Sequence, residues 1–207
     1  MRAFFIGVTM AIDRHIVVIS GFRQRHGRAT TGVDEIWSQL HHEQVGPDCA
    51  VHLKCWDDDF KSLAALIDKE RDRVNDRNPI VEIVAYSWGV GVGAIRLAKE
   101  LQQYGIDGIR LFSIDGVYSS RFWSFQWRSL LPRWTRFAPA IRIPGNIRAV
   151  MFWRQSRNVP QGHQFVALSE KTLIVPGEQP DGLIPLHTHQ TIDNSRSIRN
   201  KILETLQ

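Results

Sequence analysis

Three kinds of side chain in this sequence are suited to acyl transfer through a covalent intermediate. Ser87 supplies a hydroxyl, which is a weak nucleophile until a base removes its proton. His187 and His189, in the stretch PLHTHQTID, supply imidazoles, the side chain most often used as such a base. Asp115 supplies a carboxylate, which a catalytic histidine needs to fix its tautomer and stabilise its charged form. These residue types predict nucleophilic catalysis if the fold brings them into contact.

Ser87 lies at the junction of a predicted strand and a predicted helix. Ile80 to Tyr86 is an apolar run rich in β-branched residues, typical of a strand buried on both faces of a parallel sheet. Gly89 to Gln103 carries apolar residues at helical spacing. Because so few residues separate the two elements, the chain must bend sharply, and Ala85 and Gly89 are the small residues that flank the bend.

This junction resembles the nucleophile elbow of the α/β-hydrolases, in which a strained turn exposes a serine hydroxyl above the sheet. The family's G-x-S-x-G pattern has Ala85 at its first position here. An alternative interpretation is a buried serine followed by glycines that only let the helix pack closely on the sheet. Gly89, Gly91 and Gly93 with Asp115 also resemble a dinucleotide-binding unit, but the G-x-G-x-G spacing and mid-chain position make this a minor alternative.

The histidine pair precedes the last predicted helix, which is where the resemblance places the α/β-hydrolase histidine. We favour His189, because it lies four residues before Asp193, the predicted cap of that helix, and so at a loop tip facing the sheet end. His187 is the alternative. Both could instead be solvated loop histidines or a metal pair, but no third ligand is evident, and no metal is expected.

Asp115 ends the strand that follows the elbow helix, a position from which α/β-hydrolases can supply the acid. The commoner position follows the next strand, where this sequence reads Gln155-Ser156-Arg157-Asn158 and offers no acid. Asp181, in the last loop, is the fallback, and Glu178 a less favoured one; Asp115 as a mere turn-former before Gly116 is the competing interpretation. The order Ser87, Asp115, His189 is the order of this fold family.

Two backbone N–H groups complete what the resemblance implies. In the family, the loop after an early strand and the residue after the nucleophile donate to the oxyanion. Here these donors are the amides of Phe22 and Trp88. An ordinary strand-to-loop turn at Gly21-Phe22 is the alternative.

Strands alternate with helices along the chain, which predicts a mostly parallel central sheet with helices on both faces, a three-layer α/β sandwich. Asp57-Asp58-Asp59 supplies cap candidates for the second helix. The predicted strands are Ile16–Ser20, Cys49–Trp56, Ile80–Tyr86, Ile109–Ile114, Ile147–Trp153 and Thr172–Val175. The predicted helices are Val33–His41, Phe60–Asn75, Gly89–Gln103 and Asn194–Leu206.

A basic, aromatic segment interrupts the sheet between the fourth and fifth strands. Residues 116–169 contain eight arginines and no acidic residue. We predict a lid- or cap-like insertion at 117–146, with packing on the domain and nucleic-acid contact as alternatives. The arginines available for an anionic surface are Arg121, Arg128, Arg133 and Arg136.

Composition indicates the number of domains and the cellular compartment to expect. A chain of 207 residues with 43% hydrophobic and 23% charged residues predicts one globular domain, 1–207. Cys49 and Cys55 form no disulfide framework, and we find no clear signal or membrane-spanning segment, so we expect a cytoplasmic protein. The prediction is a serine hydrolase, esterase-, lipase- or thioesterase-like, acting on a small ester or thioester without a cofactor. The alternative is a non-catalytic module that binds nucleic acid or a membrane surface through the basic segment.

Overall fold

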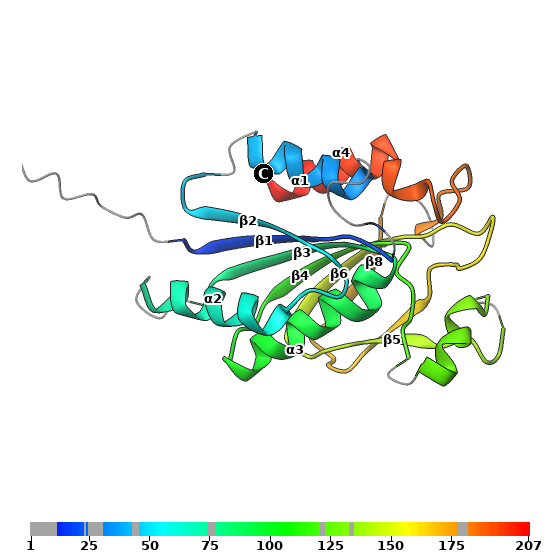
Figure 1. Cartoon of the computed structure of the whole chain (residues 1–207), viewed down its shortest axis with the longest axis horizontal. Coiled ribbons are helices and arrows are strands. Elements are labelled where there is room, and N and C mark those ends of the chain that lie inside the picture. The colour runs from blue at the N-terminus through cyan, green and yellow to red at the C-terminus, as the bar shows by residue number, and fades with distance from the viewer. Residues whose placement is uncertain are drawn as a thin grey trace, which may run out of the picture.

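A single parallel sheet forms the centre of the molecule. The structure is a computed structural model that describes residues 12–22, 24, 31–42, 46–73, 78–120, 123–132, 135–177 and 182–207. The six strands run in the order β2-β1-β3-β4-β6-β8, and every pairing is parallel (Figure 1). They are β1 (Arg14–Ile19), β2 (Cys49–Lys54), β3 (Ile80–Tyr86), β4 (Ile109–Ile114), β6 (Ile147–Trp153) and β8 (Leu173–Pro176).

The strand order reverses at β1, because β2 pairs on one side of it and β3 on the other. In open parallel sheets a crevice forms beyond the carboxyl ends of the strands at such a point, and ligands bind there. Gly21, just past β1, and Ser87, just past β3, lie at this place. Their backbones are so close that a Cβ on Gly21 would come within 2.9 Å of the Ser87 Cβ.

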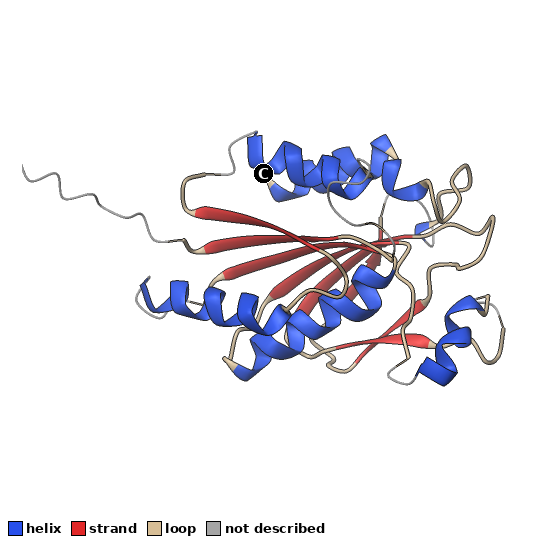
Figure 2. Ribbon diagram, in the orientation of Figure 1, coloured by secondary structure: helices blue, strands red, loops and turns tan. Residues whose placement is uncertain are grey.

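Helices cover both faces of the sheet, as Figures 1 and 2 show. Successive strand residues point to opposite faces, and the apolar side chains of β1 divide between two clusters accordingly. The helices on one face are α1 (Gly32–His42) and α4 (Arg196–Leu206), and those on the other are α2 (Phe60–Arg73) and α3 (Ile95–Gln103). The predicted α/β class and all six predicted strands are thereby confirmed, with shifts of a few residues at their ends.

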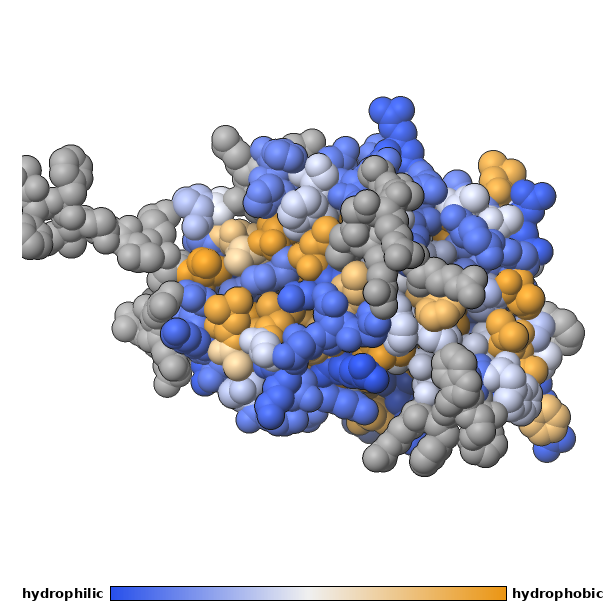
Figure 3. Space-filling view, in the orientation of Figure 1, coloured by the Kyte–Doolittle hydropathy of each residue, from blue (hydrophilic) through white to orange (hydrophobic). Residues whose placement is uncertain are grey.

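The outer surface follows from this layering. Figure 3 shows mainly polar surface over the helices and apolar surface between the two helix layers, where the sheet edge comes to view. The edge strand on that side of the sheet is β2, and all six of its residues are only partly buried.

One charge lies at the centre of the sheet. Glu82 of β3 is fully buried, and its carboxylate pairs with Arg14 of β1 at 2.6 Å and with Arg110 of β4. A buried carboxylate is tolerated only when its charge is compensated, and here both neighbouring strands supply an arginine.

The predicted N-terminal cap is confirmed for α2 and wrong for α4. Asp59 accepts hydrogen bonds from the backbone N–H groups of Lys61 and Ser62, so it caps α2 as predicted. Asp193 does not cap α4, because it belongs to a short 3₁₀ helix, η4 (Ile192–Asn194), and Ser195 precedes α4 instead. The Asp193 carboxylate points inward and accepts a hydrogen bond from Gln24 Nε2 at 2.9 Å.

The basic segment contains structure that the sequence did not predict. After β4 the chain forms a 3₁₀ helix, η2 (Trp123–Leu130), and then a short strand, β5 (Ala140–Ile143). β5 pairs in parallel with β7 (Gln164–Ala167), which follows β6. The small second sheet therefore joins the predicted insertion, 117–146, which precedes β6, to the segment of the chain between β6 and β8.

Candidate functional site

Ser87 occupies a strained turn between β3 and a π-helical turn, η1 (Gly89–Ala94). Its φ is +55°, a conformation that costs an L-residue roughly 1–2 kcal/mol. The neighbouring backbone holds it there, because Ser87 N donates to Ile114 O and Val117 N donates to Ser87 O, both at 3.0 Å. The helix approaches so closely that a Cβ on Gly89 would come within 2.7 Å of two carbonyl oxygens, those of Ile19 and Ser20.

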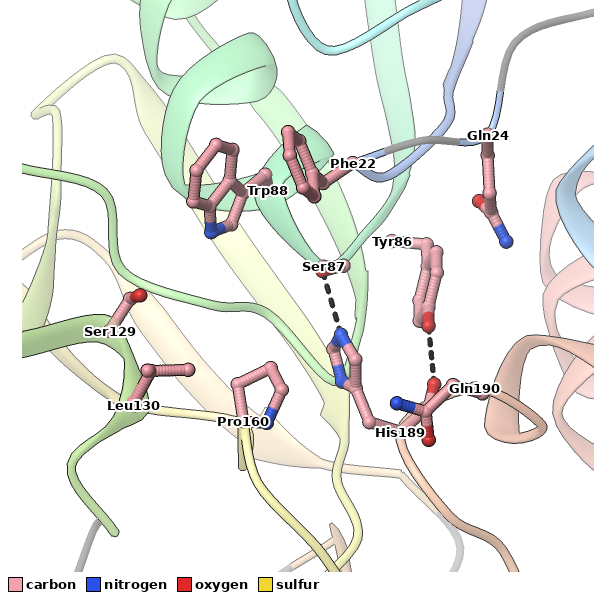
Figure 4. Close-up of a pocket in the computed structure, with 10 residues that line it drawn as sticks. All are labelled: Phe22, Gln24, Tyr86, Ser87, Trp88, Ser129, Leu130, Pro160, His189 and Gln190. Carbon is pink, nitrogen blue, oxygen red and sulfur yellow. Dashed lines mark hydrogen bonds between the residues drawn. The ribbon is translucent and has the colours of Figure 1, made fainter. Parts of the chain in front are cut away.

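His189 meets this serine from the last loop. Its Nε2 lies 2.9 Å from Ser87 Oγ (Figure 4). Two contacts orient the imidazole: the ring stacks on Tyr86 with centroids 5.2 Å apart, and the Tyr86 hydroxyl donates to the His189 carbonyl. The His189 N–H donates to Asn158 Oδ1 at 2.7 Å, which fixes the backbone of the loop.

Asp115 holds the other side of the imidazole. The distance from His189 Nδ1 to Asp115 Oδ2 is 2.6 Å, and the carboxylate is fully buried. Because a carboxylate only accepts hydrogen bonds, Nδ1 carries the proton and Nε2 is left to accept the Ser87 hydroxyl proton. Asp115 itself sits at a φ of +44°, directly after β4.

A loop after β6 surrounds the Asp115 carboxylate with donors. Oδ1 accepts the N–H groups of Gln155 at 3.1 Å and Gly162 at 2.8 Å, and Oδ2 accepts Gln155 Nε2 at 3.2 Å. The segment after β6, where the sequence has no acid, thus holds Gln155, whose amide donates to an acid that follows the neighbouring strand β4. These three hydrogen bonds hold the carboxylate in place beside His189 Nδ1.

The structure brings three of the predicted residues together. Ser87, His189 and Asp115 form one hydrogen-bonded chain. His187 is half-buried nearby, and no hydrogen bond joins its ring to either Ser87 or Asp115 in the part of the chain that the structure describes. The fallback acids Asp181 and Glu178 lie outside the described residues.

An aromatic cluster stands beside Ser87, and the sequence did not predict it. Phe22 and Trp88, the two proposed oxyanion donors, have ring centroids 4.6 Å apart, so the loops that carry these amides are adjacent. Trp56, just past β2, packs against both rings at 5.8 and 5.1 Å. The loops after β1, β2 and β3 therefore each contribute one aromatic side chain at the strand order reversal.

The glycines of η1 are used for packing within the protein. A Cβ on Gly91 would come within 2.0 Å of Val117 O, and one on Gly93 within 2.8 Å of the Ile19 side chain. Both glycines face protein atoms, so their presence is explained without the dinucleotide interpretation.

A cavity of about 470 Å³ opens onto the serine and histidine. This volume is within the range of sites for small molecules. Its lining residues are Phe22, Gln24, Tyr86, Ser87, Trp88, Ser129, Leu130, Pro160, His189 and Gln190 (Figure 4). Among the residues described, no three His, Cys, Asp or Glu side chains are placed to hold a metal ion.

Burial shifts the ionisation of three groups around the site. Burial raises the pKa of Tyr86, and the charges of Asp193 and Asp115 add to the effect, so the phenol stays neutral. Burial also raises the pKa of Asp193, although the hydrogen bond from Gln24 opposes it. Burial lowers the pKa of His163, behind Asp115, to about 4, so this second histidine is neutral near pH 7.

The basic segment is only partly described. Arg121 and Arg133 lie outside the described residues. Arg128 lies with its guanidinium carbon 5.9 Å from the centre of the Tyr118 ring, and Arg136 is exposed. Trp127 and Phe137 remain 56% and 72% exposed.

Comparisons with known proteins give little further information. No protein-family model matches the chain, and no curated protein matches it. A solved structure described as "RedJ with PEG molecule bound in the active site" is 12% identical, with 96% of this chain and 94% of that chain covered, at a TM-score of 0.47. A similarity at this level says nothing about the chemistry of the site. Among the described residues, no helix has the length and apolar character that crossing a membrane requires.

Proposed function

We propose that this chain is a serine hydrolase that cleaves a carboxylic ester or thioester, with Ser87 as nucleophile, His189 as general base and acid, and Asp115 as the orienting carboxylate. The observation that carries the proposal is the chain of two hydrogen bonds, 2.9 Å and 2.6 Å, that runs from a strained serine through one imidazole to a buried carboxylate. It combines an activated nucleophile, a base of defined tautomer and an acid that stabilises the imidazolium.

The reaction begins when Ser87 Oγ attacks the substrate carbonyl carbon while its proton passes to His189 Nε2. Asp115 stabilises the imidazolium, and the tetrahedral oxyanion accepts hydrogen bonds from the amides of Phe22 and Trp88. One such donor is worth about 3 kcal/mol of the barrier. His189 Nε2 then gives its proton to the departing alcohol or thiol, which leaves an acyl group on Ser87.

The second half repeats these steps with water. His189 Nε2 removes a proton from water, the hydroxide attacks the acyl carbonyl, and the protonated histidine returns the proton to Ser87 Oγ. The products are the carboxylic acid and the regenerated enzyme, so no cofactor enters the balance.

A fluorophosphonate probe, which reacts with activated serines, tests the assignment. We expect wild type to be labelled at Ser87 and Ser87→Ala to be unlabelled. Ser113→Ala is a matched control, because Ser113 is a buried serine at the end of β4 that does not line the cavity. Equal labelling of wild type and Ser87→Ala, or no labelling of a folded wild type, would refute the proposal.

The non-catalytic binding module stays an alternative prediction. It rests on Trp127 and Phe137, which are exposed on the same segment as Arg128 and Arg136. Salt-sensitive binding to nucleic acid or anionic vesicles that survives Ser87→Ala and disappears when Arg121, Arg128, Arg133 and Arg136 are neutralised would favour it.

A further inference from the structure

The cavity at Ser87 has two chemically different sides. In Figure 4, Trp88, Ser129, Leu130 and Pro160 lie on one side of the Ser87–His189 hydrogen bond, so this side is apolar except for one hydroxyl. Tyr86 and the amide side chains of Gln24 and Gln190 lie on the other. An ester also has two parts, an acyl group and a leaving group, which depart from the reacting carbonyl in different directions.

The apolar side has a rigid wall. The indole of Trp88 packs against both Phe22 and Trp56, with ring centroids 4.6 and 5.1 Å away, so moving it aside would break two aromatic contacts. Leu130, on η2 within the predicted insertion 117–146, lines the same cavity and is 55% exposed. An apolar ligand group placed here would remove several apolar side chains from water at once.

Hydrogen bonds hold the two amides of the polar side, that of Gln190 at an exposed position. Gln24 donates to the buried Asp193 and accepts from Gly21 N at 3.1 Å. Gln190 Oε1 accepts from Asn158 Nδ2 at 2.7 Å, and Gln190 follows the histidine that protonates the leaving group. The side of the cavity next to that proton donor is thus lined by amides with a set orientation, which suit a leaving group that itself forms hydrogen bonds.

We infer that the substrate carries an apolar acyl group of medium length, bound along Trp88, Leu130 and Pro160, and a polar leaving group on the Gln24 and Gln190 side. This inference rests on the proposed hydrolase function. A dry cavity of about 150 Å³ holds the six carbons of benzene, or about 25 Å³ per carbon. If half of the volume of about 470 Å³ serves the acyl group, about nine carbons fit.

A series of p-nitrophenyl esters, from acetate to laurate, tests the acyl side. We expect kcat/KM to rise about two- to fourfold with each added methylene, the gain from burying it, up to about eight to ten carbons and to level off beyond that. An ω-hydroxylated acyl group of the same length should lose most of this gain. A flat profile, or equal rates for the hydroxylated ester, would overturn the inference.

The residue that sets the length is Leu130. We expect Leu130→Trp to shift the optimum toward shorter chains and Leu130→Ala to reduce the preference for longer ones, while Ser87 is still labelled by fluorophosphonate. Leu168→Trp is the matched control, since Leu168 is 59% exposed, follows β7 and does not line the cavity. An unchanged profile in both Leu130 variants would refute the assignment of the apolar side.

Two failures remain distinguishable in these experiments. If Ser87 is labelled and esters are hydrolysed without regard to chain length, the acyl assignment is wrong and the hydrolase proposal stands. If a folded wild type neither reacts with the probe nor hydrolyses any ester, both are wrong.

Discussion

The substitution Gly162→Ala, which adds one methyl group next to the Asp115 carboxylate, tests the geometry of the site most closely. Gly162 N donates to Asp115 Oδ1 at 2.8 Å, and a Cβ on Gly162 would come within 2.5 Å of that same oxygen. Carbon and oxygen repel strongly at that distance, so Gly162→Ala must move the carboxylate by at least about half an ångström. The hydrogen bond from His189 Nδ1, now 2.6 Å, would lengthen or tilt as a result.

A misplacement of about 1 Å in a catalytic group costs about a hundredfold in rate. We therefore expect Gly162→Ala to react with fluorophosphonate, and to hydrolyse an ester, roughly 10- to 100-fold more slowly than wild type. Overpacking of this kind also costs about 1–3 kcal/mol of stability. Labelling rate by intact-mass spectrometry and unfolding by urea give the two quantities separately.

Gly145→Ala is the matched control for this substitution. A Cβ there would meet only Ser169 Cβ, at 3.4 Å, an ordinary contact, and Gly145 precedes β6, at the opposite end of that strand from the loop that holds Asp115. This variant should keep the wild-type labelling rate. Full activity in a folded Gly162→Ala variant would refute the idea that the Asp115 carboxylate must be held in place by the loop after β6.

Three further predictions concern stability. Glu82→Ala removes the buried partner of two arginines that are themselves 20% and 42% exposed, and should cost about 1.5–3 kcal/mol in urea unfolding. Substitution of the exposed Glu170 should change stability by less than about 0.5 kcal/mol. Burial lowers the pKa of His163 from 6.5 to about 4, so between these pH values only the unfolded chain binds a proton at this residue. The free energy of unfolding should therefore fall by up to about 1.4 kcal/mol per pH unit as the pH drops from 6.5 to 4. The fall should be shallower in His163→Gln if this variant unfolds from the same native state. Ser87→Gly should be about 1 kcal/mol more stable than Ser87→Ala. Both variants lose the hydroxyl, but only glycine adopts the φ of +55° without strain. Equal stabilities would show that the turn is unstrained.

The parts of the fold that follow from short-range pattern could be predicted. The strands of the central sheet are buried on both faces, so they stand out as apolar β-branched runs such as Ile80–Tyr86. The placement of Ser87 and Asp115 followed in turn, since both come directly after such strands and parallel strands end at the same edge. The position of His189 shortly before the last helix also indicates its place at the sheet end, although Asp193 does not cap that helix.

The parts that depend on distant contacts could not be predicted. β7 has only four residues, alternately exposed, and its partner β5 lies far away in the chain, so neither stands out as a strand. Asp193 has the sequence position of a helix cap, yet its contact with Gln24, from the other end of the chain, determines its orientation. The same holds for Gln155, which looks like an uninformative amide until the fold places it beside Asp115.

The aromatic cluster at Ser87 illustrates the same limit. Phe22, Trp56 and Trp88 follow three different strands, and nothing near any one of them in the sequence indicates that their rings meet. Once the strand order is known, the three loops are neighbours at the reversal point. A prediction of the strand order alone would have been enough to suggest that they share a wall of the site.

The central claim is that an acyl group is carried on Ser87. The most direct measurement is peptide mapping by mass spectrometry after rapid acid quenching of the enzyme with a p-nitrophenyl ester in excess. We expect a mass increase equal to the acyl group on the peptide that contains Ser87, and a loss of that species in Ser87→Ala. Ester hydrolysis that persists in Ser87→Ala, or an acyl group found on another residue, would contradict it.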